Sequence, residues 1–263
     1  MATFLGIDIG GSGIKGAVVN AADGELVSER LRVDTPQPST PPAVAQAVKT
    51  LVEMAAYSGP IGCTYPGIVK NGTMLSAANV DAGWIGCDGQ TLFNNVVGMP
   101  FIVLNDADAA GEAEMVFGAG KGKMGVVIML TFGTGIGSAL FLDGKLVPNT
   151  EFGHLHMGSK IAEARASARV KEEKDLSWSK WGKRVNDYLT HLERIFTPDM
   201  FIIGGGISKR FDRFIKYIKI NAEIVPAHFF NDAGIVGAAM AAAARFPDTS
   251  AGRKQPDPKG RSG

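Results

Sequence analysis

The apolar positions of this chain fall into short runs that are separated by glycine-containing turns. Residues 4–9 are apolar around Asp8, and residues 14–19 form a second run rich in β-formers after the turn Gly10-Gly11-Ser12-Gly13. Two such runs on either side of a glycine turn predict a β-hairpin. A third strand is expected within residues 26–33, which would complete an antiparallel three-stranded start.

The next segments alternate between helical and strand patterns. Residues 41–59 carry apolar positions at helical spacing, with prolines at the front and Gly59 at the end, which predicts a helix that covers the first sheet. Residues 60–69 and 100–106 are short apolar runs that end in turn residues, as parallel strands do. A further helix is expected within residues 108–122.

The opening pattern then returns. Residues 124–147 predict strand, glycine turn, strand, hairpin turn and strand, with TFGTGIG in the place that DIGGSGIKG held. A charged helical stretch at 162–175, an amphipathic one at 178–196, a strand at 199–206 and an alanine-rich helix at 232–246 complete the order. The repeat predicts an α/β fold of two similarly built lobes whose glycine turns face one cleft.

Composition narrows the class of protein. The 263 residues are 45% hydrophobic and 20% charged with a net charge of +1, which suits a globular protein of one large or two medium domains and predicts no general attraction to nucleic acid or membrane. The two cysteines, Cys63 and Cys87, are too few for a disulfide framework or a cysteine-rich zinc site. Because no secretory signal or membrane-spanning run is found, we expect a cytoplasmic location. Residues 247–263 have almost nothing to bury and are expected to form a disordered tail.

The glycine turns predict a phosphate site. Without Cβ atoms, successive backbone N–H groups can converge on an anion, and a nearby lysine adds a charge-assisted contact. A tight hairpin alone would also use glycine, but three glycine turns at strand ends favour phosphate, although neither hairpin loop is a Walker or dinucleotide motif. Two glycine turns that each join two strands resemble the arrangement of the actin, hexokinase and Hsp70 fold, which implies that Asp8 lies beside a phosphate-bound Mg²⁺ that it would contact indirectly. A hydrogen-bonded aspartate at a strand end is the alternative. The expected donor-binding residues are Asp8, Gly10, Gly11, Ser12, Gly13, Lys15, Thr131, Gly133, Thr134, Gly135, Gly204 and Gly205.

Candidate chemistry for a hydroxyl substrate lies elsewhere. Asp106 follows a predicted strand and can accept the proton of an attacking hydroxyl, while Asn105 can bind a neighbouring hydroxyl. Helix capping is the alternative for Asp106, but Asp108 can serve as that cap. Glu151 and His154, three residues apart, can hydrogen-bond vicinal hydroxyls of a sugar. His154 and His156 lack the further ligands of a zinc site.

These motifs, in this order, resemble the ROK family (repressor, open reading frame, kinase) of sugar kinases: DIGGSGIKG, the PG of TYPGIV, NDAD, LTFGTGIGSAL and EFGH. The resemblance implies a two-lobed actin/hexokinase-like (ribonuclease H-like) ATPase fold with a cleft between the lobes. It implies an N-terminal lobe of residues 1–104, joined by the last helix at about 235–246, and a C-terminal lobe of residues 105–234. It also implies Asp106 as general base toward the sugar 6-hydroxyl, a homodimer, and sugar contacts at Gly67, Asn105, Glu151 and His154.

One departure from the family concerns zinc. Most bacterial members carry a CxCGxxGCxE motif after the histidine of EFGH, whereas this chain has no cysteine beyond residue 87, so no structural zinc is expected. The glutamate that ends that motif contacts sugar in the family, and EARAS supplies Glu163 at the matching spacing. A solvated helix face is the alternative for Glu163.

The compact length and the run PDMFIIGGGISK are most similar to the actinobacterial polyphosphate-using glucokinases of this family, one of which also accepts mannose. That resemblance implies inorganic polyphosphate as donor, with or without ATP. Basic residues that could guide such a chain are Lys15, Lys121, Lys123, Arg165, Arg169 and Lys171, although each is also typical of solvated surface.

The predicted function is therefore that of a hexose 6-kinase that phosphorylates glucose, with polyphosphate, ATP or both as phosphoryl donor. Mannose is the second candidate substrate. One alternative is a glucokinase that uses ATP alone. A sugar-responsive repressor is a second, but the first strand begins near Phe4 and leaves no helix-turn-helix before it. An actin-like filament or chaperone ATPase would have no use for the set Asn105, Asp106, Glu151 and His154.

Overall fold

The computed structural model describes residues 2–78 and 80–247, and within these the chain forms two sheets of the same topology. The first sheet has the strand order β3-β2-β1-β4-β7, and the second has the order β10-β9-β8-β13-β14. In each sheet the first two pairings are antiparallel and the last two are parallel. The repeat that the sequence predicted is therefore a repeat of topology, and the α/β two-lobed fold class is confirmed. The strands are β1 (Thr3–Ile9), β2 (Ile14–Asn20), β3 (Leu31–Val33), β4 (Ile61–Tyr65), β7 (Phe101–Asn105), β8 (Val126–Phe132), β9 (Ile136–Leu142), β10 (Lys145–Val147), β13 (Met200–Gly204) and β14 (Glu223–Pro226).

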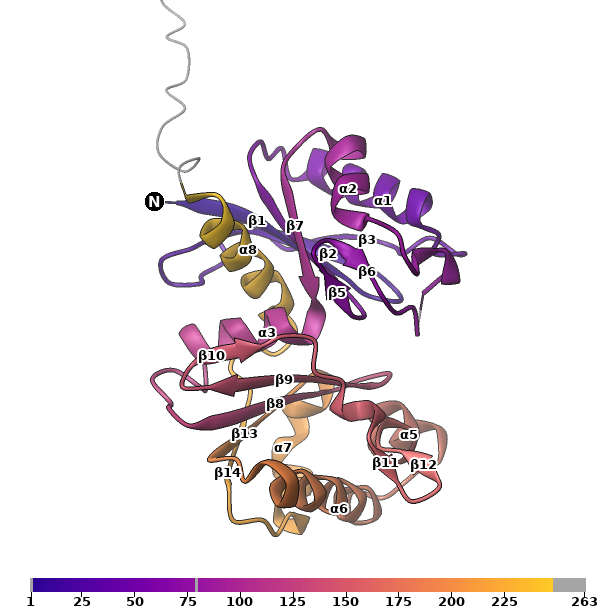
Figure 1. Cartoon of the computed structure of the whole chain (residues 1–263), viewed down its shortest axis with the longest axis vertical. Helices are drawn as coiled ribbons and strands as arrows, with labels where there is room; N and C mark the ends of the chain where they lie inside the picture. Colours follow the sequence, from indigo (N-terminus) through magenta and orange to yellow (C-terminus); the bar gives the residue numbers. More distant parts are fainter. Residues whose placement is uncertain (1, 79, 248–263) are drawn as a thin grey trace, which may run out of the picture.

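The two sheets lie in separate lobes that stack along the long axis of the molecule (Figure 1). Helices α1 (Pro41–Met54) and α2 (Gly89–Val97) lie beside the first sheet and bury their apolar faces in the N-terminal core. Helix α6 (Trp178–Phe196) lies beside the second sheet, where Trp181, Val185 and Leu189 are fully buried. Each lobe therefore has its own hydrophobic core.

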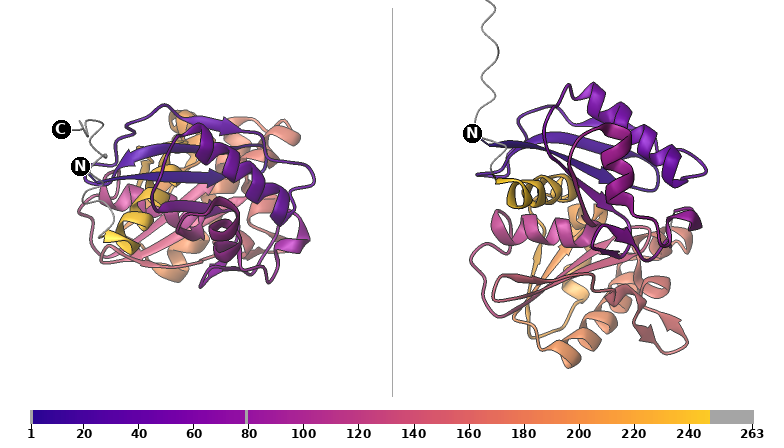
Figure 2. Two further views of the ribbon diagram at one scale, coloured as in Figure 1. Left: turned by 90° about the horizontal axis from the view of Figure 1, so that it is seen from above. Right: turned by 45° about the horizontal axis from the view of Figure 1, so that its top comes forward.

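Helices α3 (Asp106–Val116) and α8 (Ala233–Arg245) lie between the lobes, as the right-hand view of Figure 2 also shows. Small residues let them approach closely: a Cβ on Gly237 would collide with the main chain of Ala109, and one on Gly62 would collide with the main chain of Ala238. The last helix of the chain thus packs on strands β1 and β4 of the first sheet as well as on α3. Since α3 begins directly after β7, the end of that strand lies where the lobes meet.

Shorter elements complete the architecture. Two small hairpins protrude near the sheet ends, β5–β6 and β11–β12, and α4, α5 and α7 are helices of four to six residues. Their bounds are β5 (Val69–Lys70), β6 (Thr73–Met74), β11 (His156–Met157), β12 (Lys160–Ile161), α4 (Glu163–Ala166), α5 (Ala168–Glu173) and α7 (Phe211–Phe214). Four 3₁₀ turns link these elements within the described residues, η1 (Ala82–Trp84), η2 (Phe152–His154), η3 (Gly206–Arg210) and η4 (Ile215–Tyr217).

Several predicted boundaries differ from the structure. The strand expected within residues 26–33 is limited to β3 and a single bridge between Val19 and Leu26. The first helix ends at Met54, before Gly59, because Ala56 adopts a left-handed φ of 46°. The stretch 162–175 is two short helices, since Ser167 is extended and caps the second one by accepting a hydrogen bond from the Val170 N–H. The expected tail lies outside the described residues except for Pro247.

Candidate functional site

A cavity of about 520 Å³ opens between the lobes, and residues from both sheets line it. The two hairpin turns, β1–β2 and β8–β9, both contribute lining residues, and the start of α3 contributes Asp106. The lining residues are Gly10, Gly11, Ser12, Pro66, Gly67, Ser76, Ala78, Asn105, Asp106, Thr131, Gly133, Thr134, Gly135, Ile136, Gly137, Ser138, Glu151, His154, Glu163 and Gly205. Most of the predicted donor and sugar residues therefore share one cavity, whereas Asp8, Gly13, Lys15 and Gly204 do not line it.

Two carbonyl groups of the first glycine turn accept hydrogen bonds from side chains of β3 and of the segment that follows it. Thr35 Oγ1 donates to the Gly10 carbonyl at 2.5 Å, and Arg32 Nη2 donates to the Ser12 carbonyl at 3.0 Å. Within the described residues, the N–H groups of Gly11 and Ser12 have no hydrogen-bond partner. Free amides beside occupied carbonyls favour an anion as ligand of this turn. Arg32 and Thr35 were not identified from the sequence, because nothing in a loop pattern shows which side chain will fold over it.

The glycines of the two hairpin turns are not required by backbone strain. Neither Gly11 nor Gly133 has a positive φ, and a Cβ at either position would meet no protein atom within 4 Å. The explanation that a tight hairpin needs glycine here is therefore wrong for these two positions. Because Gly11 and Gly133 have no side chains, the part of the cavity next to them stays open.

Asp8 lies near the end of β1, two residues before Gly10 of the first turn. Its Oδ1 accepts a hydrogen bond from Thr64 Oγ1 at 2.8 Å, and its strand neighbour across the hairpin is Lys15. Burial raises the pKa of this carboxyl, with the Asp232 charge adding to the rise, while Thr64 and Lys15 oppose it.

These contacts bear on the magnesium site that the fold implies. Within residues 2–78 and 80–247 no cluster of three or more His, Cys, Asp or Glu side chains could hold a metal. Mg²⁺ commonly keeps several waters and takes one carboxylate plus substrate phosphates, and the second oxygen of Asp8 has no hydrogen-bond partner in the described part. The residues therefore fit a magnesium ion that arrives with the phosphate donor.

Asn105 and Asp106 mark the junction of β7 and α3. Asn105 is the N-cap: its Oδ1 accepts from the Asp108 N–H at 2.9 Å, and its Nδ2 donates to the Gly67 carbonyl at 3.0 Å. The expectation that Asp108 caps this helix is wrong. Asp108 is buried instead and accepts from the Asn149 N–H at 2.8 Å. With the cap supplied by Asn105, the Asp106 carboxylate faces the cavity, and among the described residues it accepts a hydrogen bond only from its neighbour Ala107.

The electrostatic setting of Asp106 suits a proton acceptor. Its pKa is raised to about 7, first because the carboxyl is desolvated and second because the Asp8, Glu151 and Asp108 carboxylates repel its charge. The N–H of Ala107 opposes the rise. A carboxylate with a pKa near neutrality is a stronger base than an ordinary aspartate and is still ionised for much of the time at physiological pH.

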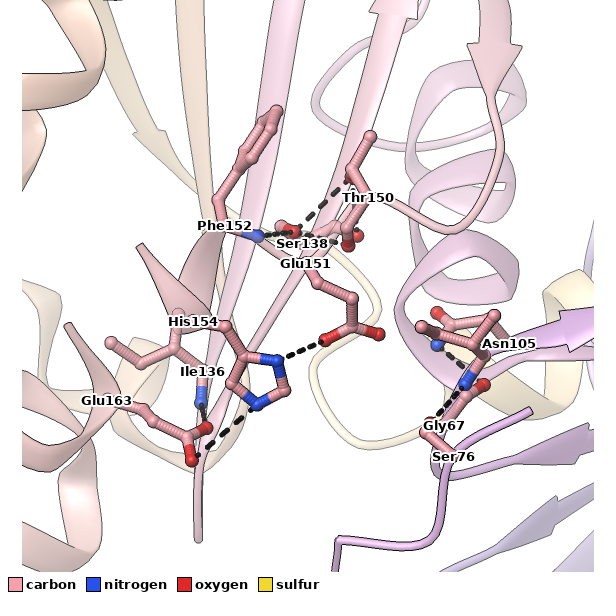
Figure 3. A network of polar contacts seen from close by, with 11 residues as sticks. Gly67, Ser76, Asn105, Ile136, Ser138, Thr150, Glu151, Phe152, His154 and Glu163 are labelled. Atoms are coloured by element: carbon pink, nitrogen blue, oxygen red, sulfur yellow. Dashed lines mark hydrogen bonds and ion pairs between the residues drawn. The ribbon is translucent and has the colours of Figure 1, made fainter. Parts of the chain in front are cut away.

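Three further side chains form a row on the opposite wall (Figure 3). His154 lies between two glutamates, with Nδ1 at 3.6 Å from Glu151 Oε2 and Nε2 at 3.9 Å from Glu163 Oε1. Glu163 also accepts from the Ile136 N–H at 3.3 Å, which ties it to the second glycine turn. The pKa of Glu151 is raised by burial and by Glu163, and lowered by His154. This row offers both donors and acceptors, as sugar hydroxyls require.

Two serines that the sequence analysis missed support this site. Ser138 Oγ donates to the Thr150 carbonyl at 2.7 Å and accepts from the Phe152 N–H at 2.9 Å, so it holds the main chain on both sides of Glu151. Ser76 Oγ accepts from the Ile68 N–H at 2.9 Å beside Gly67. Single serines in β-rich segments carry no sequence signal that distinguishes such a role.

A wider cavity of about 760 Å³ adjoins the second glycine turn and shares Gly133 and Thr134 with the first. Of the basic residues considered from the sequence, Arg169 and Lys171 line it, whereas Lys123 is paired with Glu223 at 2.7 Å. The cavity also contains Trp178, over whose ring the Lys171 ammonium lies at 4.2 Å. Its cationic residues are Arg169, Lys171, Arg210 and Arg213.

Comparisons with known proteins agree with this geometry. The polyphosphate glucokinase of Mycobacterium tuberculosis is 50% identical over 241 residues, which is 91% of each chain. The structure of an inorganic polyphosphate/ATP-glucomannokinase from Arthrobacter sp. strain KM superposes with a TM-score of 0.91 at 47% identity, over 94% of this chain and all of that one. A ROK family glucokinase from Streptomyces griseus, in complex with glucose and AMPPNP, superposes with a TM-score of 0.81 at 26% identity over 92% and 99% of the two chains.

The described part of the chain contains no helix that is both long and apolar enough to cross a bilayer. The family model for ROK proteins matches residues 4–166, which is most of the first lobe together with the glycine turn and the Glu151, His154 and Glu163 row of the second. The motifs, the duplicated sheet topology and these matches lead to the same conclusion, that this chain belongs to the ROK family.

Proposed function

We propose that this protein is a hexose 6-kinase that transfers a phosphoryl group from inorganic polyphosphate, and also from ATP, to glucose and mannose. The observation that carries the proposal is the position of Asp106. Its carboxylate, with a pKa of about 7, faces a cavity that has free glycine amides on one side and the Glu151, His154 and Glu163 row on the other.

In the proposed reaction the sugar 6-hydroxyl attacks the terminal phosphorus of the donor. The hydroxyl proton passes to Asp106, the new O–P bond forms, and the bond to the bridging oxygen breaks, which releases a chain one phosphate shorter or ADP. Positioned base catalysis of this kind contributes a factor of about 10² to 10⁴. Mg²⁺, when bound beside Asp8, would offset charge on the phosphates.

The remaining residues bind and orient the two substrates. We assign the sugar to Gly67, Asn105, Glu151, His154 and Glu163. Each polar atom of Asn105 has one partner in the described residues, so its second amide hydrogen and the second lone pair of Oδ1 are available to the sugar. We assign the donor phosphates to the turns at Gly10–Gly13 and Gly133–Gly135, together with Thr131, Thr134 and Gly205, while Lys15 and Gly204 act from the margin of the cavity. The lobes, residues 1–104 with the last helix and residues 105–234, would close to exclude water from the reaction.

The identity of the donor is supported by the relatives and by the second cavity. Polyphosphate and polyphosphate/ATP are named for proteins that are 50% and 47% identical to this chain. The cavity beside Thr134 is lined by four cationic side chains, which suit a run of phosphates, and by one acidic side chain, Glu172. We therefore propose that the two donors share the glycine turns. A homodimer in the cytoplasm completes the proposal, and light scattering of the purified protein tests the dimer.

The test is the formation of hexose 6-phosphate by purified protein with Mg²⁺, from glucose or mannose, and from nucleotide-free polyphosphate or ATP in separate reactions. Turnover with polyphosphate is the expected result. Turnover with ATP alone would identify an ATP-dependent glucokinase, and sugar binding without turnover from either donor would favour a sugar-responsive binding protein.

A further inference from the structure

A separate cavity of about 260 Å³ lies on the C-terminal lobe and shares no lining residue with the cavity between the lobes. It is formed where the β11–β12 hairpin meets α4, α5 and α6. Four of its seven lining residues are cationic and none is acidic. The lining residues are Met157, Ser159, Lys160, Ala164, Arg165, Lys174 and Arg184.

The two arginines of this basic cavity are held by main-chain carbonyls rather than by carboxylates. Arg165 Nη1 donates to the Met157 carbonyl at 2.8 Å, and Arg184 Nη1 donates to the Arg165 carbonyl at 3.1 Å. Carbonyl partners orient a guanidinium without neutralising it. Both arginines therefore keep their full charge and have N–H groups to spare.

Little acidic charge opposes these cations. Asp187 is 3.9 Å from Arg165, and this carboxylate is 57% exposed, so water and salt screen the pair. Within the described residues, Lys160, Lys174 and Arg184 have no ion-pair partner. In a protein with a net charge of only +1, this is a local concentration of positive charge and not a consequence of composition.

The chemistry of the lining indicates which anion fits. Guanidinium groups bind phosphate oxygens through paired hydrogen bonds. Because two lysines lie beside the two arginines, a ligand with several negative charges complements this lining best. Among the residues that the structure describes, no aromatic side chain lines this cavity, in contrast to the one that contains Trp178, and these residues therefore offer no ring on which a nucleotide base could stack. A chain of linked phosphate groups that carries no nucleotide base has the several negative charges and needs no stacking surface.

We infer that this basic cavity binds a segment of an inorganic polyphosphate chain, away from the phosphate that is transferred. The inference rests on the proposed function for the identity of the polyanion. Segment 151–163 connects the two sites, since Glu151 and Glu163 line the catalytic cavity and Met157 and Lys160 line the basic one. A long chain held at both places has a raised effective concentration at the glycine turns, an advantage that ATP and triphosphate lack.

The test compares two double variants that remove the same charge. Lys160→Ala/Lys174→Ala takes exposed lysines from the basic cavity, and Lys145→Ala/Lys219→Ala takes exposed lysines that line none of the three cavities. Calorimetric titration without sugar gives the Kd of long-chain polyphosphate and of triphosphate, and thermal unfolding checks that each variant folds. We expect the first variant to raise the Kd of long-chain polyphosphate about tenfold and to leave that of triphosphate unchanged, and the control to change neither.

If the Kd of long-chain polyphosphate rose equally in both variants, the effect would come from net charge alone and the inference would be overturned. An unchanged Kd in the first variant would also overturn it. Because the titration needs no turnover, it is independent of the donor assignment. A wild-type protein that transfers phosphate only from ATP would contradict the proposed function, while a loss of polyphosphate binding confined to the Lys160/Lys174 variant would still support the basic cavity.

Discussion

The side-chain amide of Asn149 makes two hydrogen bonds with the main chain of Val69, which lies 80 residues earlier in the other lobe. Oδ1 accepts from the Val69 N–H at 2.9 Å, and Nδ2 donates to the Val69 carbonyl at 2.9 Å. The N–H of Asn149 in turn donates to Asp108, whose Oδ1 is buried without a partner in the described part of the chain. Since Val69 lies two residues after Gly67 and Asn149 lies two residues before Glu151, this clamp joins two walls of the cavity to which we assign the sugar.

Asn149→Ala should therefore raise the KM for the sugar about tenfold, with a smaller effect on kcat, because each lost hydrogen bond contributes about 0.5–1.5 kcal/mol. Steady-state kinetics with varied glucose measures this. Asn149 has a left-handed φ of 58°, which alanine tolerates poorly, so Asn71→Ala is the matched control: Asn71 is exposed and has a φ of 52°. If both variants lose the same stability and neither changes KM, the clamp does not position the sugar site.

Asp106→Asn should lower kcat by about 10² to 10⁴ and leave sugar affinity nearly unchanged. The amide has the shape of the carboxyl and keeps an oxygen for the Ala107 N–H, so the start of α3 is preserved. Turnover is compared with the Kd of glucose from titration. Near-wild-type turnover in a folded Asp106→Asn protein would show that another group takes the proton.

The pH profile is expected to follow the ionisation of the same carboxyl. The base must be deprotonated to act, so kcat/KM should rise with pH and level off above an apparent pKa of about 7. The Asp108 charge is one of the causes that raise this pKa, so Asp108→Asn should move the rise to lower pH. The measurement is kcat/KM from pH 5 to 9 at constant ionic strength, in the wild-type protein and in Asp108→Asn. If the two pH profiles coincide, ionisation of Asp106 does not limit the rate at low pH.

The raised pKa of Asp106 also has a cost for folding. Between its ordinary value of 3.8 and about 7, the folded state holds a proton that the unfolded state has lost, so this group lowers stability as pH rises through that range. Asp106→Asn should therefore be more stable than wild type at pH 8 by on the order of 1 kcal/mol, with the difference vanishing near pH 4. Thermal unfolding at the two pH values measures this, and a variant that is less stable at pH 8 would show that the ionised carboxylate is well solvated.

The fold could be predicted from the sequence where local pattern and tertiary structure agree. The two strand–glycine–strand units are visible because alternating apolar residues and turn residues are local properties, and their duplication gives the two-lobed topology. The hairpins β5–β6 and β11–β12 were not predicted, because strands of two residues leave no periodicity. Helix α2, which begins with Asp88 as a cap and ends before Gly98, was also missed, although both signals are present in the sequence.

The site was predicted less completely than the fold. The glycine turns, Asp106, Glu151 and His154 belong to motifs, so their residue types indicate their chemistry. Asn149 and Ser138 act through contacts with segments distant in the sequence, and a single asparagine or serine does not indicate its partner. Asp108 was assigned the cap that Asn105 provides, because spacing alone does not distinguish two polar residues at the start of a helix.

Gly11→Ala separates donor binding from folding. A Cβ at Gly11 meets no protein atom and the φ there is not left-handed, so the variant should fold with an unchanged or slightly raised Tm. The added methyl group would occupy the space next to the free amides, and the KM for polyphosphate and for ATP should rise at least about tenfold while the Kd of glucose stays the same. Gly62→Ala is the contrasting variant, because its Cβ would collide with the main chain of α8 and should unfold the first lobe. If Gly11→Ala kept both donor KM values, the first turn would not bind phosphate, and its bare backbone would have no explanation in either folding or catalysis.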